Sequence, residues 1–374
     1  MKLLATAADI GATISAIRLV DPLQALQAQR PALALRLKSF HECLRGDLAW
    51  ADVLIVQRGN SRRAWRLVQS MQASGGRVVF EIDDLLTAVP AALLHHRAAQ
   101  QGLPWLARCL TAADRVSVST ARLGRALQPP PRDWCVVPNH GWAPVGGWPA
   151  GPFPAPRRCD RATLLLASSD HVPVAAFVAG LRRLPPTLQW RLVAVGPVAD
   201  DLARAGVQAQ RHAPLPRPAF LQWARALPDV LAVMPVGDTP FDACKSAIKF
   251  YDYALAGVPV LCAARPPYSD AVCDGVTGLL AADTPEGWAH ALQRAIEDSQ
   301  ATASRVAAAQ RQADAEHRLG HTVQTWADLL DGLVLQARRD VPGGGPAAWL
   351  QGWAVRLRRA NRERLARRHG REPV

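Results

Sequence analysis

Two lysines spaced one helical turn apart are the residues of this sequence best suited to chemistry on a phosphate. Lys245 and Lys249 are half of the four lysines in a chain that also carries 40 arginines. They stand in a window that predicts a helix over 245–256, with Ser246 as its N-cap and Gly257 as the residue that ends it. The free N–H groups and the positive dipole end of a helix N-terminus suit a phosphate. The pair therefore predicts a diphosphate-binding helix.

A carboxylate shares one face of that helix. Asp252 follows Lys249 by three residues, and a carboxylate acceptor suits the hydroxyls of a ribose. One short helix could therefore supply cations for a diphosphate and an acceptor for the sugar of a nucleotide. The same spacing also describes a surface helix with an ordinary Lys–Asp pair, which contributes little to stability. The spacing alone leaves both interpretations open.

Further charged candidates stand where predicted strands end. Arg58 follows the strand 52–57, and Asp83 and Asp84 follow the strand 78–82. At the carboxyl edge of a parallel sheet, the arginine could bind a phosphate or another part of a substrate. The two aspartates could bind substrate hydroxyls or transfer a proton. A solvated arginine and a helix N-cap are the plain alternatives.

Three weaker candidates have ordinary structural explanations as well. His171, in the loop after the strand 163–167, could hydrogen-bond a phosphate or a sugar, although a lone loop histidine often has no such role. Glu81 and Asp83 share a strand face and imitate a metal-binding Asp-x-Asp motif. Arg18 could also face the site.

Strands that alternate with helices organise these residues. Because the strands read as continuous apolar runs, they predict parallel sheets of βαβ units, covered on both faces. Ligands of such sheets bind at the carboxyl ends of the strands, so we expect the site in a cleft between two such domains. The predicted strands are 52–57, 78–82, 115–118 and 135–137, followed by 163–167, 191–195, 230–234 and 258–262.

Proline marks the boundary between the two domains. Residues 129–156 contain nine of the 30 prolines, together with several glycines, which disfavours regular helix or sheet. Helical patterns then run from Thr284 towards the end. The expected units are an N-terminal Rossmann-like domain (1–140), a Pro/Gly-rich linker (141–158), a C-terminal Rossmann-like domain (159–320), a closing helix (321–340) and a basic amphipathic tail (341–374).

The net charge of +13 on 374 residues first suggests a polyanionic partner, but its distribution argues otherwise. Eight arginines against two glutamates give the tail +6, which leaves +7 on the other 340 residues. The excess of arginine over lysine indicates GC-biased coding, and no nucleic-acid-binding motif is present. In the tail, Trp349 and Trp353 share a face flanked by arginines, which could lie on an anionic membrane; a solvated tail is the alternative.

Cysteine spacing and hydropathy bear on the compartment. The seven cysteines occur singly, which argues against a disulfide framework or a zinc ribbon. No apolar run reaches the roughly 18 residues of a membrane helix. The N-terminus is charged too early for a long signal-peptide core. We therefore expect a cytoplasmic protein whose tail could contact the inner face of the membrane.

The window 245–260 also carries a family resemblance. Its pattern, Lys-Ser-x-x-Lys-Phe-x-Asp-Tyr-Ala-x-x-Gly-Val-Pro-Val, resembles the donor-binding helix of GT-B glycosyltransferases near family 4, also called group 1. The continuations at 267–270 and 274–280 are similar to the same family, as are 51–58, 80–85 and 136–139. The resemblance spans about residues 50 to 320. It implies an α/β protein with two doubly wound Rossmann-like domains facing across a cleft, followed by C-terminal helices.

The resemblance also implies a nucleotide-sugar donor held by the C-terminal domain and an acceptor against the N-terminal domain. Of the family's two carboxylates spaced eight apart, the second falls on Asp252 and implies contact with the ribose. The first falls on Cys244, which cannot replace a carboxylate, so Asp242 stands as a shifted substitute. Because 167–171 lacks the basic residues usual there, Lys245 and Lys249 become the main diphosphate clamp. The expected catalytic residues are Asp83, Asp84 and Lys249, and the expected substrate-binding residues are Lys245, Ser246, Lys249, Asp252, Asp242, Arg58, His171 and Tyr268.

The function implied is transfer of a sugar from a nucleotide sugar to a glycan or lipid-linked acceptor. We expect retention of configuration, no metal and no cofactor beyond the nucleotide sugar, in bacterial surface polysaccharide or glycoconjugate synthesis. Cys244 in the usual acidic position favours one alternative, a catalytically degenerate binding protein of the same fold. A nucleotide-sugar epimerase of the same architecture is the other.

Overall fold

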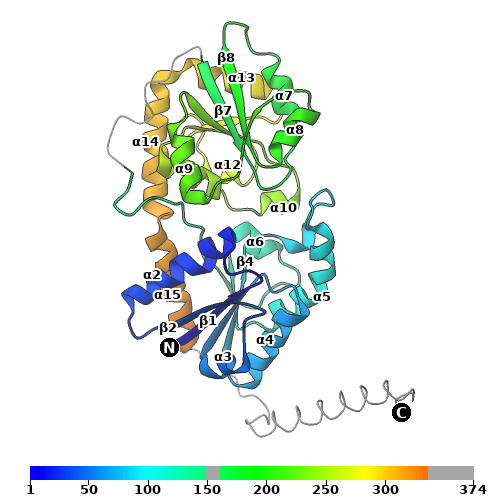
Figure 1. Ribbon diagram of the computed structural model, residues 1–374, viewed down its shortest axis with the longest axis vertical. Helices are drawn as coiled ribbons and strands as arrows, with labels where there is room; N and C mark the ends of the chain where they lie inside the picture. The colour runs from blue at the N-terminus through cyan, green and yellow to red at the C-terminus, as the bar shows by residue number, and fades with distance from the viewer. Residues whose placement is uncertain (149–160, 336–374) are drawn as a thin grey trace, which may run out of the picture.

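Two six-stranded parallel sheets, one in each half of the chain, form the framework of the computed structural model (Figure 1). The structure describes residues 1–148 and 161–335. The N-terminal sheet has the order β2-β1-β3-β4-β5-β6, and the C-terminal sheet has the order β12-β11-β10-β7-β8-β9. In each sheet the order reverses beside the first strand of that half, which creates the switch point where α/β sheets bind ligands.

The strands of the N-terminal sheet are β1 (Lys2–Ala7), β2 (Ala34–Ser39), β3 (Val53–Gln57), β4 (Arg77–Ile82), β5 (Arg115–Val118) and β6 (Trp134–Val136). Those of the C-terminal sheet are β7 (Arg161–Ala167), β8 (Gln189–Val195), β9 (Gln210–His212), β10 (Val230–Met234), β11 (Val260–Ala263) and β12 (Leu279–Ala281). Every residue of β3 and β10 is buried, as expected for central strands covered by helices on both faces.

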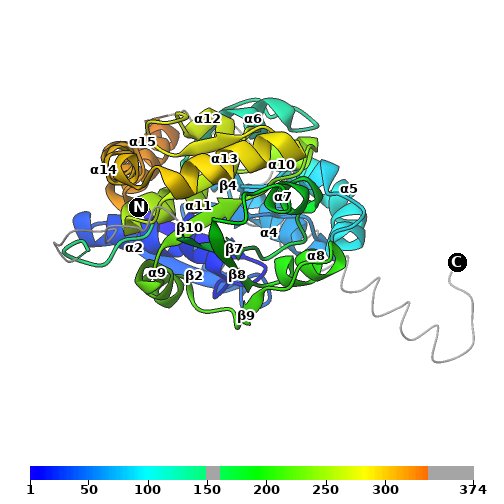
Figure 2. The ribbon, with the colours of Figure 1, turned by 90° about the horizontal axis from the view of Figure 1, so that it is seen from above.

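Helices cover both faces of each sheet. Those of the N-terminal half are α1 (Thr13–Ser15), the π-helix η1 (Ala16–Val20), α2 (Asp21–Gln29), α3 (Arg45–Trp50), α4 (Arg62–Ala73), the 3-10 turn η2 (Leu86–Ala88), α5 (His96–Ala112) and α6 (Ala121–Ala126). Those of the C-terminal half are α7 (Ala175–Leu181), α8 (Val198–Arg204), α9 (Arg217–Ala226), α10 (Pro240–Ala243), α11 (Ile248–Ala256), α12 (Tyr268–Ala271), α13 (Pro285–Glu297), α14 (Ser299–Glu316) and α15 (Leu319–Leu335). Viewed from above, α7 and α13 lie side by side over the second sheet (Figure 2).

All eight predicted strands are present, but four strands were not predicted. β1 opens the chain, and β2, β9 and β12 are edge strands, of which β9 and β12 have only three residues. The burial pattern of β2 is mostly intermediate, so its sequence lacks the continuous apolar run that marks a central strand.

The predicted helix 245–256 starts later than expected. The structure forms a separate turn, α10, capped by the Thr239 side chain, and α11 begins only at Ile248 after Ala247. Ser246 therefore lies in the loop between the two helices and is not an N-cap. Gly257 ends α11 in the left-handed conformation with φ 76°, as predicted, because glycine adopts this region without a steric penalty.

The chain passes between the domains twice at neighbouring places. The Gly141 N–H donates to the His317 carbonyl at 2.8 Å, and the Thr322 hydroxyl donates to the Pro138 carbonyl at 3.0 Å. Beyond this crossing, α15 packs against α2, so the closing helix returns to the N-terminal domain (Figure 1). Most of the predicted linker and all of the basic tail, with Trp349 and Trp353, lie outside the described residues. Within the described residues, no helix is both long and apolar enough to cross a membrane.

Candidate functional site

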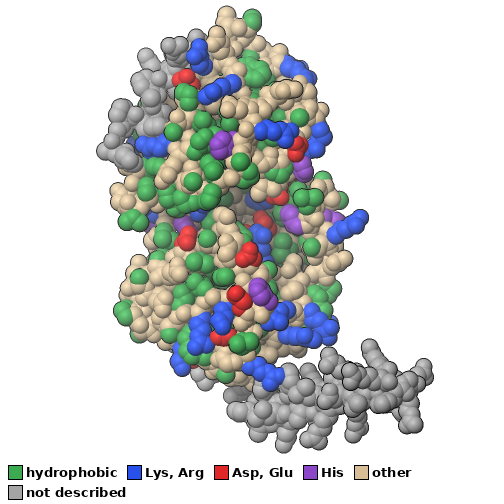
Figure 3. Space-filling model, viewed as in Figure 1, with side chains coloured by type: hydrophobic (Ala, Val, Ile, Leu, Met, Phe, Trp, Pro, Cys, Tyr) green, Lys and Arg blue, Asp and Glu red, His purple; other side chains and the backbone are tan. Residues whose placement is uncertain are grey.

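A cleft between the two domains brings together charged residues from both sheets (Figure 3). Arg58 follows β3, Asp84 follows β4, Asp170 follows β7, and Lys245 lies in the loop between β10 and α11. Lys245 Nζ lies 3.6 Å from Asp170 Oδ2. The charges of these two C-terminal groups also act on the carboxyl of Asp84 in the N-terminal domain. The site that was expected at the carboxyl ends of the strands therefore contains residues of both domains.

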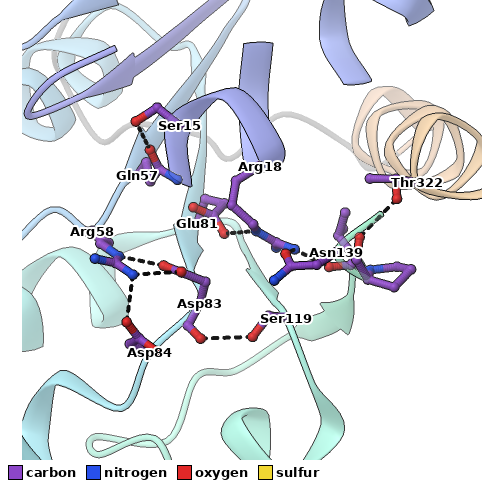
Figure 4. Close-up of polar contacts among 12 residues, drawn as sticks. Ser15, Arg18, Gln57, Arg58, Glu81, Asp83, Asp84, Ser119, Asn139 and Thr322 are labelled. Carbon is purple, nitrogen blue, oxygen red and sulfur yellow. Dashed lines mark hydrogen bonds and ion pairs between the residues drawn. The ribbon is translucent and has the colours of Figure 1, made fainter. Parts of the chain in front are cut away.

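Arg58 binds both of the aspartates that follow β4 (Figure 4). Its Nε donates to Asp83 Oδ1 at 2.5 Å, and its Nη2 donates to Asp83 Oδ2 and Asp84 Oδ2, both at 2.6 Å. The Arg58 backbone has φ 47°, which side-chain-bearing residues rarely adopt. Burial alone would lower the pKa of the Arg58 guanidinium. The charges of Asp83 and Asp84 outweigh this effect and raise the pKa above its ordinary value. This strained residue therefore stays charged at the mouth of the cleft.

The two aspartates consequently differ in what they can do. Both carboxylate oxygens of Asp83 accept from Arg58, and the Asp83 carbonyl accepts from the Ser119 hydroxyl at 2.9 Å. Asp84 accepts from the same guanidinium through one of its oxygens, Oδ2. Burial and the charge of Asp83 raise the pKa of the Asp84 carboxyl. Neither aspartate caps an α-helix, and Asp84 is the better placed of the two for proton transfer.

Lys249 lies on the first turn of α11 and reaches the end of β7. Its Nζ donates to the Ala167 carbonyl at 2.9 Å. Burial lowers the pKa of Lys249 to about 8, and the charge of Lys245 acts in the same direction. Together with Ser168, Pro235 and Tyr268, Lys249 lines a small pocket at the carboxyl ends of β7 and β10. Burial also raises the pKa of the Tyr268 phenol, which therefore stays protonated.

Lys245 has three partners around its ammonium. Asp170 lies at 3.6 Å, Asp242 at 3.9 Å, and the centroid of the Phe241 ring at 4.6 Å. The side chain of Lys245 is 28% exposed, so the ammonium remains accessible from the cleft. The two lysines that the sequence singled out thus lie near each other, but Lys245 and Ser246 come from the loop and only Lys249 from the helix.

The residue at the family's first acidic position does not point into the pocket. Cys244 is 2% exposed and belongs to the hydrophobic core of the N-terminal domain. Its carbonyl accepts from the Thr120 hydroxyl at 3.0 Å. Asp242 Oδ2 instead accepts from the Thr239 hydroxyl at 2.6 Å, and its backbone N–H donates to the same hydroxyl. Asp242 therefore holds the turn of α10, with its other oxygen toward Lys245.

Asp252 is placed differently from the expectation that it contacts a ribose. Its carboxylate forms an ion pair with Arg217 at 2.6 Å and accepts from the Trp142 N–H at 2.8 Å. Arg217 also donates to the His140 carbonyl at 2.6 Å. These contacts fasten α9 and α11 to the chain between the domains. The ribose contact stays a prediction, and these partners were not foreseen because the shared helix face says nothing about which neighbouring element covers that face.

His171 is tied to α8 at the rim of the cleft. Its Nδ1 lies 2.9 Å from Asp201 Oδ1, and Asp201 Oδ2 accepts from the Val172 N–H at 2.8 Å. Asp201 also binds Arg204. Since His171 is 35% exposed, its other ring nitrogen stays available to a ligand. The histidine remains a substrate-binding candidate, now with an identified partner.

Arg18 and Glu81 are buried together and do not face the cleft, in contrast to the expectation for Arg18 (Figure 4). Arg18 Nε donates to Glu81 Oε1 at 2.7 Å, and Arg18 Nη1 donates to the Val137 carbonyl and to Asn139 Oδ1. Burial raises the pKa of Glu81. Glu81 and Asp83 thus bind two different arginines. Among residues 1–148 and 161–335, no group of three or more His, Cys, Asp or Glu could hold a metal ion.

Two residues of the cleft went unassigned in the sequence. Asp170 stands three residues after β7, and its position behind a central strand was the available signal. Phe241 looked like an ordinary apolar residue before the lysine window. Its contact with Lys245 depends on the packing of α10 against the other domain, and no local sequence pattern reveals that packing.

Solved structures share the whole architecture at low sequence identity. HepE of Anabaena, solved with UDP and glucose, matches with a TM-score of 0.62 and 16% identity over 89% of this chain and 100% of HepE. Sucrose-phosphate synthase of Thermosynechococcus elongatus matches with a TM-score of 0.65 and 13% identity, over 89% of this chain and 99% of that one. The lipopolysaccharide outer core galactosyltransferase WaaB matches with a TM-score of 0.57 and 12% identity, over 89% of this chain and 99% of WaaB.

These likenesses establish the fold. The chain has the GT-B architecture of two facing Rossmann-like domains, which confirms the predicted fold class. A structure identified as a UDP-N-acetylglucosamine 2-epimerase of Listeria monocytogenes has the same architecture, with a TM-score of 0.54 and 13% identity over 90% of this chain and 98% of that one. No family model and no curated protein sequence matches the chain.

Proposed function

We propose that this protein is a glycosyltransferase that moves a sugar from a nucleotide-sugar donor to a glycan or lipid-linked acceptor. The observation that carries the proposal is the convergence of cations from both sheets on one cleft. Arg58 comes from the N-terminal domain, and Lys245 and Lys249 come from the C-terminal domain. HepE, which has the same fold, is solved with UDP and glucose, and WaaB is a galactosyltransferase. Both support this assignment.

The chemistry follows from where charge develops in the reaction. As the glycosidic bond of the donor breaks, negative charge grows on the leaving diphosphate. Lys249 at the pocket and Lys245 beside it are placed to stabilise that charge in a partly desolvated site. Closure of the two domains would exclude water from the reacting sugar. These lysines would neutralise the diphosphate without a divalent ion, which makes metal independence part of the proposal.

The acceptor hydroxyl must lose a proton when it attacks. Asp83 is committed to Arg58 through both oxygens, so it does not suit the role of a covalent nucleophile. We therefore assign deprotonation to the donor phosphate, with Asp84 orienting the acceptor hydroxyl, and expect retention of configuration. Synthesis of a bacterial surface polysaccharide or glycoconjugate is the proposed setting, with the basic tail as a membrane contact.

Release of the nucleotide from candidate donors tests the proposal. The purified full chain is incubated with UDP- and GDP-sugars, with and without acceptor extracts, and free nucleotide is measured. Lys245→Ala and Lys249→Ala should each lower turnover at least tenfold. Lys2→Ala serves as the matched control, because Lys2 is an exposed lysine on β1. A protein that binds donors but releases no nucleotide with any acceptor contradicts the proposal.

The alternatives give different products. An epimerase, favoured by the Listeria structure of the same fold, would convert one nucleotide sugar into its epimer while the nucleotide stays attached. Chromatography of the nucleotide-sugar pool separates this outcome from transfer. A degenerate binding protein is favoured by Cys244, whose side chain is buried in the other domain and cannot contact a sugar. Such a protein would bind the nucleotide sugar and leave it unchanged.

A further inference from the structure

The short helix α10 belongs to the C-terminal domain by sequence but inserts its one buried side chain, Phe241, into the core of the N-terminal domain. Phe241 is 1% exposed and joins the hydrophobic cluster of the N-terminal half, as does Cys244. The helix contacts η2, and the Phe241 ring lies 6.2 Å from that of His95. The bond from the Thr120 hydroxyl to the Cys244 carbonyl fixes the end of the same turn. We call residues 240–244 the α10 plug.

The buried ring of the plug also contacts the partly exposed ammonium of Lys245. Lys245 Nζ lies 4.6 Å from the centroid of the Phe241 ring, within the range of a cation–π interaction. The other partners of Lys245 are Asp170 and Asp242, at 3.6 and 3.9 Å, and both belong to the C-terminal domain. The ammonium is therefore held between two carboxylates of its own domain and a ring that is seated in the other domain.

We propose that Phe241 is a positioning residue that couples docking of the two domains to the placement of Lys245 at the donor diphosphate. When the ring enters the N-terminal core, it offers Lys245 a neutral partner on the cleft side. When the ring leaves the N-terminal core, it loses the packing that holds it against Lys245, and Asp170 and Asp242 then compete with a diphosphate for the ammonium. The inference rests on the proposed function, because it assumes that Lys245 meets a diphosphate. It explains how donor cleavage would wait until the acceptor domain is in place.

A double-mutant cycle measured with UDP tests the coupling. The dissociation constant is measured by calorimetry for the wild type, Phe241→Leu, Lys245→Met and the double variant, all as full chains. Phe241→Leu keeps an apolar plug but removes the ring, and should weaken UDP binding about three- to tenfold. In the Lys245→Met background the same change should have less than a twofold effect. Phe241→Tyr, which restores a ring, should return the affinity to within twofold of the wild type.

The control and the contrary results are equally specific. Phe40→Leu removes another buried ring of the same cluster and should leave UDP affinity within twofold. The inference is overturned if Phe241→Leu weakens UDP binding equally in the presence and in the absence of Lys245. It is also overturned if Phe40→Leu weakens UDP binding as much as Phe241→Leu does. In both cases the proposed function stands. If the wild type binds no nucleoside diphosphate at all, the proposed function and this role of Phe241 both fail.

Small-angle scattering tests the plug without any ligand. Phe241→Ser places a polar group in the apolar cluster and should increase the radius of gyration, because the domains separate. Circular dichroism and the melting temperature establish that each domain remains folded, and Phe241→Leu provides the milder variant if they do not. An unchanged radius of gyration in folded Phe241→Ser would show that the plug does not hold the domains together.

Discussion

Arg217 and Asp252 form an ion pair with nitrogen–oxygen distances of 2.6 and 3.0 Å, and this pair joins α9 to α11 beneath the chain that links the domains. The two side chains are only 10% and 13% exposed. Asp252 also accepts from the Trp142 N–H, and Arg217 donates to the His140 carbonyl. One pair therefore supports two helices and the linker.

Removing one partner of this pair should destabilise the C-terminal domain. Asp252→Asn leaves a poorly exposed guanidinium without its counter-charge, and we expect a loss of about 3 kcal/mol in the free energy of unfolding. Denaturant unfolding measures it. The control is Asp331→Asn, which breaks the far more exposed pair with Arg30 and should change stability little. If Asp252→Asn instead keeps full stability and abolishes UDP binding, then Asp252 contacts the ribose, as the family resemblance implies, and its ion pair with Arg217 contributes little to stability.

UDP binding should weaken as the pH rises through about 8. The pKa of Lys249 is lowered to about 8, so the free protein loses this positive charge at a pH where an ordinary lysine keeps it. Lys245 and Asp170 face the same group and act in opposite directions. Titrations from pH 6.5 to 9.5 should show the decline in the wild type. Lys249→Arg, which stays charged throughout, should show a flat profile, and the same decline in that variant would assign the titration to another group.

Replacing Lys249 by an apolar residue should stabilise the fold while it removes function. The folded-state pKa lies below the unfolded value near 10.5, so burial of the charged form costs stability below pH 8, and stability rises with pH between about 8 and 10.5. At pH 7, Lys249→Met should raise the free energy of unfolding by about 1 to 3 kcal/mol, after the loss of the hydrogen bond to Ala167. Thermal and denaturant unfolding test this. A less stable Lys249→Met protein would mean that the hydrogen bond outweighs desolvation.

Arg58 offers a way to separate backbone strain from side-chain charge. Arg58→Ala and Arg58→Gly both leave Asp83 and Asp84 without their guanidinium, and both should lower turnover. Because the residue has φ 47°, the glycine variant should be more stable than the alanine variant by about 1 kcal/mol. Equal stability of the two variants would indicate that the backbone relaxes when the arginine is lost.

Some of these residues could be found from the sequence because parallel sheets place strand ends on one edge. That rule located Arg58, Asp83 and Asp84, each directly behind an apolar strand. It could not assign partners: the two oxygens of Asp83 go to Arg58, while Glu81, two residues earlier, goes to Arg18. Partner choice depends on elements far apart in the chain, such as η1 and β4.

The helix around Lys245 shows the other limit. The prediction began a single helix at 245 and left α10 out, although Thr239 and Pro240 are a sound start signal for a separate turn. The break between them sends Phe241 and Cys244 into the opposite domain and leaves Lys245 in the cleft. Local sequence preference contains no information on which domain receives an apolar turn, so this part of the site required the tertiary structure.

The return of α15 to the N-terminal domain has a mechanical consequence. Because α15 packs on α2, the last described residue, Leu335, is attached to the domain that would hold the acceptor. Any surface that captures residues 336–374 would therefore keep that domain stationary. The C-terminal domain would then be the one that moves. It would rotate about the place where the chain passes between the domains, at the hydrogen bond from Gly141 to His317. An enzyme built this way could remain beside an immobile acceptor while it exchanges spent nucleotide for fresh donor on the mobile side.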